Sequence, residues 1–195
     1  RKEDFDPPEC FRVDLAGAVL NLAAWGVTVP ENFRWLDVPA PLVMQRAVNL
    51  LAALGATEED GSLTDTGKRM TAFPLPPRLA RLMVAGQDEQ CAVELAAVAA
   101  LMQGEGVAVK GGLNDHLRDS ADYTDFQAEW RAVEKAVDAG FGAAACTRWG
   151  ISSRGAREAW MAYRQLLSVG SRGKARETPG PDFTAARPCR SPCND

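Results

Sequence analysis

The run from Leu63 to Ala80 reads LTDTGKRMTAFPLPPRLA in this 195-residue chain. It separates a part with helices and a predicted hairpin from a part with helical patterns alone. Thr64 or Asp65 can cap a short helix, because a side-chain oxygen at that position accepts a hydrogen bond from a free amide of the first turn. The prolines at the end of the run predict a stop to that helix, since proline lacks an amide hydrogen and restricts the residue before it. We therefore expect one structural unit before the prolines and another after them.

Upstream of this run, the apolar residues indicate two helices. They recur at helical spacing over residues 14–25, where Asp14 can act as the N-cap and Gly26 as a stop. The same spacing returns over residues 42–54 and ends at Gly55.

The segment between the second helix and Thr64 predicts a small hairpin. Its pair Asp60-Gly61 offers the positive φ angles that a tight turn between two very short strands requires. Two helices, a β-wing and a third short helix together predict a winged-helix-like unit.

After the prolines, every segment up to residue 169 has a helical pattern. The expected helical segments are 78–85, 89–102, a looser 104–120, 123–139, and a last helix from Ser152 or Ser153 to residue 167. The part from Cys91 to Met102 is apolar nearly all round, so we expect it at the buried centre of an α-bundle.

These patterns predict a mainly α protein, with a winged-helix-like unit that carries a small β-wing, followed by an α-helical bundle. The last residues are rich in Gly, Ser, Arg and Pro without a hydrophobic period, which is typical of a flexible tail. The predicted divisions are a linker at 1–11, a winged-helix-like domain at 12–75, a helical bundle at 76–169 and a tail at 170–195.

The sequence lacks the motifs of an ATPase or of a nucleophilic enzyme. No glycine-rich loop ends in Gly-Lys-Ser/Thr, which would be needed to cradle phosphates. The single histidine, His116, has no recognisable nucleophile near it in sequence. Cys189 and Cys193 are spaced like half of a zinc site, but no second ligand pair exists. We expect no catalytic residue, no metal site and no cofactor in this chain, and we expect its cysteines to be reduced thiols.

Composition indicates an ordinary globular protein of the cytoplasm. The chain is 46% hydrophobic and 25% charged, and no apolar run is long enough to cross a bilayer. The net charge is −4, which alone would disfavour nucleic acid, but the residues from 148 to 176 are strongly basic, with Glu158 as their one acid.

Several stretches give the chain a resemblance to a known family. Residues 63–80 resemble the pattern L-T-x-x-G-R-x-M-A-x-F-P-L-x-P-R-L-A of the helicase-associated region of DEAH/RHA-type helicases. Further similar segments occur in the family's order at residues 14–27, 35–41, 47–56, 115–130 and 146–166. The resemblance covers roughly residues 10–168, and bacterial members of the family are the most similar.

The resemblance implies a non-catalytic accessory region of an ATP-dependent RNA helicase. In that family the winged helix packs on the second RecA-like lobe of the motor, and the helical bundle, called the ratchet domain, closes over the channel for single-stranded RNA. DNA is a further expected substrate, and an activating protein on the winged helix a further expected partner. ATP and magnesium would belong to an upstream motor, of which residues 1–11 would be the linker, because the chain starts without methionine and reads as a fragment.

Four arginines are the candidate nucleic-acid contacts: Arg148, Arg154, Arg157 and Arg164. Guanidinium groups contact phosphates and stack on bases, and the spacing of the last three returns them to one helical face. The alternative is that these arginines only solvate an outer helical face or pair with acidic neighbours.

The chain departs from the family pattern near these arginines. Trp149-Gly150 replaces Asn-Phe, and Tyr163 replaces an arginine. Trp149 can stack a base or pack in the bundle, and packing is favoured because an indole buries a large apolar area.

Two other functions fit the same patterns. One is a free-standing winged-helix DNA-binding regulator with a helical interaction domain, and the other is a protein-interaction scaffold without a nucleic-acid role. A basic recognition helix would favour the regulator.

Overall fold

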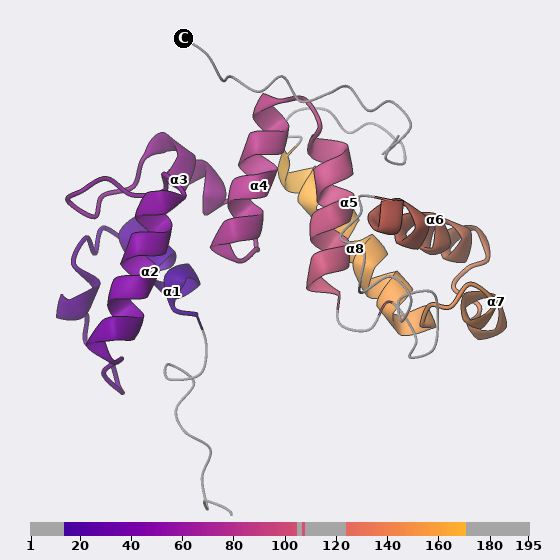
Figure 1. Ribbon diagram of the computed structural model, residues 1–195, viewed down its shortest axis with the longest axis horizontal. Helices are drawn as coiled ribbons and strands as arrows, with labels where there is room; N and C mark the ends of the chain where they lie inside the picture. Colours follow the sequence, from indigo (N-terminus) through magenta and orange to yellow (C-terminus); the bar gives the residue numbers. More distant parts are fainter. Residues whose placement is uncertain (1–13, 105–106, 108–123, 171–195) are drawn as a thin grey trace, which may run out of the picture. The chain divides into compact units, whose positions relative to one another are not determined.

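The computed structural model describes residues 14–104, 107 and 124–170, which form two compact units. The first unit ends at Val84 and the second begins at Ala85, so the division falls inside one helix. The elements of the first unit are α1 (Ala16–Ala24), the 3-10 helix η2 (Pro30–Asn32), α2 (Pro41–Ala53), α3 (Asp65–Met70) and most of α4 (Pro77–Asp88) (Figure 1). The second unit continues with α5 (Ala92–Gln103), α6 (Thr124–Asp138), α7 (Ala143–Arg148) and α8 (Ser153–Gly170). The prediction of a mainly α chain is confirmed for these residues.

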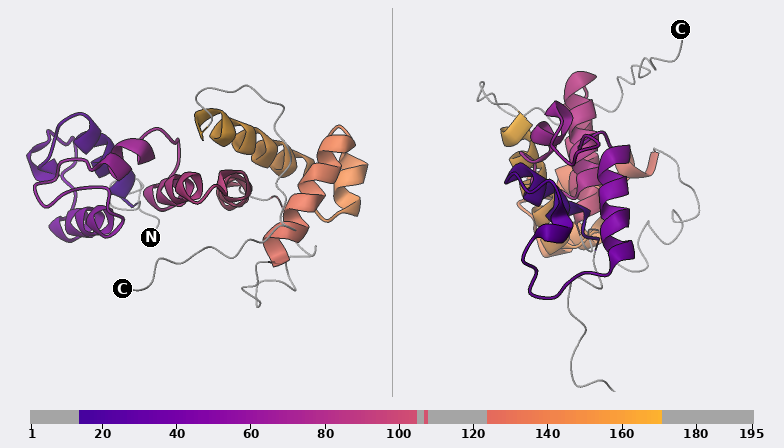
Figure 2. Two further views of the ribbon diagram at one scale, coloured as in Figure 1. Left: turned by 90° about the horizontal axis from the view of Figure 1, so that it is seen from above. Right: turned by 90° about the vertical axis from the view of Figure 1, so that its left-hand side faces the viewer.

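Helices α1 and α2 lie side by side in the first unit (Figure 2). Their buried residues are Ala16, Val19, Leu20, Leu22 and Ala23 on α1, and Met44, Ala47 and Leu51 on α2. The N-cap of α1 is Leu15, so the helix begins one residue later than an Asp14 cap predicts. The Asp14 carboxylate still accepts a hydrogen bond from the Ala16 amide, at 2.9 Å. Gly26 and Gly55 follow the two helices at φ values of +87° and +65°, as predicted for helix stops.

The prediction of a β-wing was wrong. Thr57 and Leu63 form a single antiparallel bridge, and the described part of the chain contains no strand. The expected turn is present, with Gly61 at φ +81°. The bridge consists of two hydrogen bonds, from the Thr64 amide to the Ala56 carbonyl oxygen and from the Glu58 amide to the Ser62 carbonyl oxygen. The ladder ends there because Thr64 is already the N-cap of α3. No residues remain to extend the two strands.

Gly67 allows α3 to lie directly against the backbone that follows α2. A Cβ atom at this position would overlap the carbonyl oxygen of Ala56. Met70 and Phe73, at the end of α3 and just beyond it, are buried at 0% and 5% exposure. The close approach of α3 therefore places two large apolar side chains in the core of the first unit.

Two arginines tie α4 to the rest of the first unit. The Nη2 of Arg69 donates to the carbonyl oxygen of Val84 at 3.3 Å. The Nε of Arg81 donates to the carbonyl oxygen of Leu54 at 3.2 Å, which reaches the C-terminal end of α2. These arginines satisfy backbone carbonyls, so part of their hydrogen-bonding capacity serves the fold.

In the second unit, α8 packs against α5, α6 and α7. Ala96, Ala97, Ala99 and Ala100 of α5 are completely buried, which confirms the expected buried centre. Small side chains let neighbouring helices approach closely. Helix α5 begins at Ala92 instead of residue 89, because Gln90 adopts a φ of +59° between α4 and α5.

The prediction that a serine caps the last helix is confirmed. Ser152 accepts a hydrogen bond from the Gly155 amide at 2.8 Å, and α8 starts at Ser153. The six-residue α7 was not predicted. Of the predicted tail, Gly170 is the last residue of α8. The described residues do not include the linker at 1–11, most of the looser segment 104–120, residues 171–195, His116, Cys189 and Cys193.

The contact at Gly67 predicts a strong effect on stability. Gly67→Ala should lower the free energy of unfolding by about 1–3 kcal/mol, since the new methyl group must displace backbone. The measurement is urea unfolding followed by circular dichroism.

Gly17→Ala is the matched control, because it also adds one methyl group to a helical glycine. Its new Cβ would meet only the Pro77 Cδ, at 3.9 Å. This variant should be unchanged or more stable by up to about 1 kcal/mol, as alanine favours the helix. Equal stability of Gly67→Ala and the wild type would contradict the close approach of α3.

Candidate nucleic-acid interface

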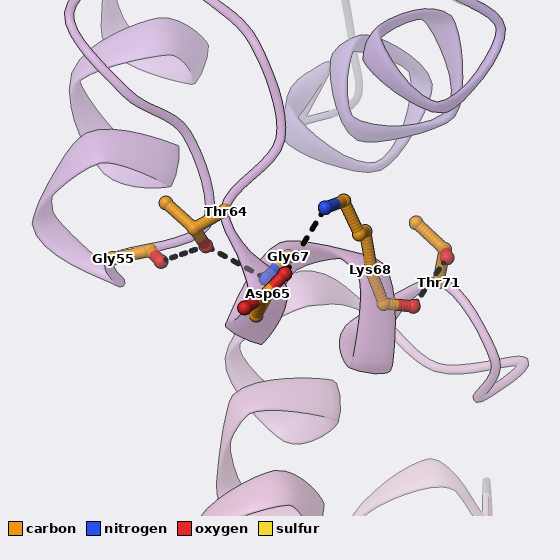
Figure 3. A network of polar contacts seen from close by, with 6 residues as sticks. All are labelled: Gly55, Thr64, Asp65, Gly67, Lys68 and Thr71. Atoms are coloured by element: carbon orange, nitrogen blue, oxygen red, sulfur yellow. Dashed lines mark hydrogen bonds and ion pairs between the residues drawn. The ribbon is translucent and has the colours of Figure 1, made fainter.

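The Thr64 side chain joins the end of α2 to the start of α3 (Figure 3). Its hydroxyl donates to the Gly55 carbonyl oxygen at 2.6 Å and accepts from the Gly67 amide at 2.9 Å. Thr64 is therefore the N-cap predicted from sequence. Lys68 of α3 forms an ion pair with Asp65 at 3.0 Å. The hydrogen bonds of Thr64 therefore stabilise the fold of the first unit.

The helices that could read DNA offer little free positive charge. On α2, Gln45 donates to Asn49 at 2.8 Å, and Arg46 is the one basic residue of the helix. On α3, Lys68 is paired with Asp65, and Arg69 donates to a backbone carbonyl. A recognition helix needs basic and polar groups free to meet phosphates and base edges, so these contacts disfavour the regulator.

In α8 the three predicted arginines lie on the exposed side of the helix. Ala156, Ala159, Tyr163 and Leu166 form its buried side, at 0–1% exposure. Arg154, Arg157 and Arg164 are all exposed, together with Met161 at 60%. The helical spacing that predicted one face is thus matched by the burial of the opposite face.

Arg148 lies at the end of a different helix, α7, and is exposed. Helix α7 packs against α8, so Arg148 belongs to the same unit as the other three. No ion pair or side-chain hydrogen bond joins Arg148 or Arg164 to another residue in the part of the chain that the structure describes. Both guanidinium groups are available to an anionic ligand in this arrangement.

Arg154 has an acidic partner. Its Nε lies 2.8 Å from the Glu158 Oε1, and the hydrogen bond to Glu158 raises the pKa of the Arg154 guanidinium. Exposed pairs of this kind are weak, so a phosphate can compete for Arg154. The alternative of pairing with an acidic neighbour describes Arg154 better than the other three.

An aromatic cluster fixes the inner side of α8 against α6. The Trp130 ring centroid lies 4.7 Å from that of Tyr163 and 6.0 Å from that of Trp160. Tyr163 is completely buried, and burial raises the pKa of its hydroxyl, which remains protonated at neutral pH. At this position the helicase-associated pattern has an arginine, and here the side chain packs in the core.

Glu134 supplies the polar partner of this cluster. Its Oε1 accepts a hydrogen bond from the Trp130 Nε1 at 3.0 Å. Partial burial raises the pKa of the Glu134 carboxyl above its ordinary value of 4.5, against the lowering effect of that hydrogen bond. The cluster therefore combines rigid aromatic packing with one carboxylate that is costly to ionise.

Two features were missed in the sequence. Phe141 lies under the guanidinium group of Arg157, with 5.3 Å between the Arg157 Cζ and the ring centroid. Its position between two glycines, just before a helix, was the available signal. The other feature is a group of exposed apolar residues between α1 and the first turn of α2, namely Trp25, Val29, Phe33, Leu36, Val38 and Leu42.

Trp149 is half-buried directly after α7.

Within the described residues, no helix is long and apolar enough to span a bilayer. The same residues contain no group of three or more His, Cys, Asp or Glu side chains placed to hold a metal ion.

Comparison with protein families gives a match over part of the first unit. Residues 47–75 match the family model described as the helicase associated domain (HA2), winged-helix. The matched stretch runs from the middle of α2 through the bridge of Thr57 and Leu63 and α3, and it includes the Thr64 cap and Gly67. Residues 47–75 are therefore similar to a helicase-associated winged helix.

The raised pKa of Glu134 predicts a pH-dependent stability. The folded state binds the proton of the Glu134 carboxyl more tightly than the unfolded state does. The contribution of Glu134 to the free energy of unfolding therefore falls as the pH rises from about 4.5 through the folded-state pKa. Glu134→Gln keeps an oxygen for the Trp130 indole and removes the charge. At pH 7 the variant should be more stable than the wild type, by no more than about 1 kcal/mol because solvent screens a partly exposed carboxylate.

Urea unfolding of both proteins between pH 4 and pH 8 measures this difference, which should shrink towards the acidic end. Glu134→Ala is the control, because it removes the charge and the acceptor together. That variant should be less stable than Glu134→Gln by about 1–2 kcal/mol at every pH, since the indole N–H is left without a partner. A gap between Glu134→Gln and the wild type that does not change with pH would contradict the carboxylate's role.

Proposed function

We propose that this chain is the non-catalytic accessory region of an ATP-dependent DEAH/RHA-type RNA helicase of the bacterial type, acting in the cytoplasm. The observation that carries the proposal is the match of residues 47–75 to the helicase-associated winged helix. The wider sequence resemblance supports the assignment of the second unit to the helical bundle of the same family. ATP and magnesium would be bound by the motor, outside this chain.

The proposed partner of the first unit is a RecA-like motor domain. Leu36, Val38 and Trp25 are 99%, 74% and 77% exposed, which is a high exposure for three large apolar side chains close together in sequence. Exposed apolar patches usually mark protein interfaces. An activating protein would be a further occupant of the winged helix.

The proposed role of the second unit is to guide single-stranded nucleic acid. Arg148, Arg157 and Arg164 would contact phosphates, and Arg154 would join them when a phosphate displaces Glu158. The buried face of α8 is held by alanines and by the aromatic cluster, so the arginines project from a rigid support. Movement of the motor lobes would then draw the strand past a fixed basic wall.

Charge reversal on α8 tests this role. Arg157→Glu combined with Arg164→Glu should weaken binding of a twelve-nucleotide oligouridine at least about tenfold at low salt, because two phosphate contacts become repulsive. The slope of log affinity against log salt should also become shallower by roughly 0.7 for each phosphate that the protein no longer neutralises. Fluorescence anisotropy with a labelled strand measures both quantities.

The matched control is Lys68→Glu combined with Arg78→Glu, which changes the net charge equally at two exposed positions of the first unit. It should weaken binding less than about twofold, through the long-range effect of net charge alone. An equal weakening in the two double variants would show that binding follows net charge, and the proposed surface on α8 would be rejected.

A further inference from the structure

The turn between α6 and α7 holds an aromatic residue in a conformation that suits glycine. Phe141 has a φ of +59°, close to the +60° of the preceding Gly140. Residues with a side chain rarely adopt this region, and a bulky one does so only where its surroundings compensate.

Hydrogen bonds hold the Phe141 backbone on both sides. Its amide donates to the Ala136 carbonyl oxygen at 2.7 Å, which closes the end of α6. Its carbonyl oxygen accepts from the Ser153 hydroxyl at 2.6 Å, which joins it to the first residue of α8. The ring is therefore carried on a firmly positioned backbone, and it is half-buried.

The ring supports Arg157. The Arg157 Cζ lies over the Phe141 ring, 5.3 Å from its centroid, a distance at which a guanidinium cation is attracted to an aromatic face. Arg157 is nevertheless exposed. In the described part of the chain, no ion pair or side-chain hydrogen bond joins Arg157 to another residue, whereas Arg154 is engaged by Glu158.

A guanidinium group is planar and has two faces. The Arg157 Cζ lies over the Phe141 ring, which restricts the group before a flat ligand arrives, and because Arg157 is exposed the group keeps a face for that ligand. Unpaired nucleobases stack on arginine planes and on aromatic rings whatever their sequence.

We propose that Arg157 is a stacking site for one unpaired nucleobase and that Phe141 is the residue that positions it. The proposal rests on the proposed function, because it adds a base contact to one of the arginines that would contact phosphates. It predicts that this surface distinguishes a strand with bases from a bare sugar-phosphate backbone of equal charge.

The experiment uses two labelled twelve-nucleotide strands, one RNA of alternating adenosine and cytidine and one in which every base is missing. The wild-type chain should bind the strand with bases at least about fivefold more tightly, the lower end of the effect of one stacked base. Arg157→Lys keeps the charge and removes the plane, and Phe141→Leu keeps apolar volume and removes the ring. Both should abolish most of this preference, and both keep a positive charge at residue 157 for the phosphates of either strand.

Arg154→Lys is the matched control, because it makes the same substitution one turn away on a residue paired with Glu158. It should retain the preference. Circular dichroism checks the fold of Phe141→Leu, and Arg157→Lys, at an exposed position, decides the question if that variant unfolds.

The possible failures are distinct. Equal wild-type affinity for the two strands would overturn the stacking site and leave the phosphate surface standing, and so would a preference that survives Arg157→Lys. Absence of binding to either strand would overturn the proposed guidance of nucleic acid and the stacking site with it.

Discussion

The first unit depends on the junction where Thr64 and Gly67 bring α3 against the end of α2. The Thr64 hydroxyl serves two backbone groups at once, the Gly55 carbonyl and the Gly67 amide. The missing side chain at Gly67 then leaves room for the Ala56 carbonyl oxygen. The hydroxyl caps the first turn of α3 and ties it to the end of α2, which fixes the direction of α3. Met70 and Phe73 are buried as a result.

In the second unit, the packing of the core determines which residues of α8 are exposed. The alanines of α5 and the aromatic rings of Trp130 and Tyr163 leave α8 one possible buried side. The arginines of α8 follow from this choice, because the same helical period that buries Tyr163 turns Arg157 and Arg164 outward. A basic surface on a rigid support is what a sequence-tolerant strand guide requires.

Helices and caps could be predicted because their signals are local. A threonine before a short helix, a serine before a long one and a glycine after a helix act within four residues of themselves. The β-wing failed because a strand needs a ladder, and the Thr64 cap ended that ladder after one bridge. The exposure of the three arginines of α8 followed from helical spacing. The side chains that these arginines contact could not be predicted from spacing. Phe141 contacts Arg157 from the turn between α6 and α7, and the Arg154–Glu158 pair is one of several contacts that spacing allows.

The central claim is that this chain serves a helicase motor. It is tested most directly by measuring ATP hydrolysis by the protein translated together with its upstream coding sequence, with and without single-stranded RNA. The account predicts an upstream Gly-Lys-Thr loop and Asp-Glu-x-His box, and hydrolysis that RNA stimulates and that loses most of this stimulation when the protein is truncated before Asp14. An upstream sequence without these motifs, or RNA stimulation that survives the truncation unchanged, would contradict it.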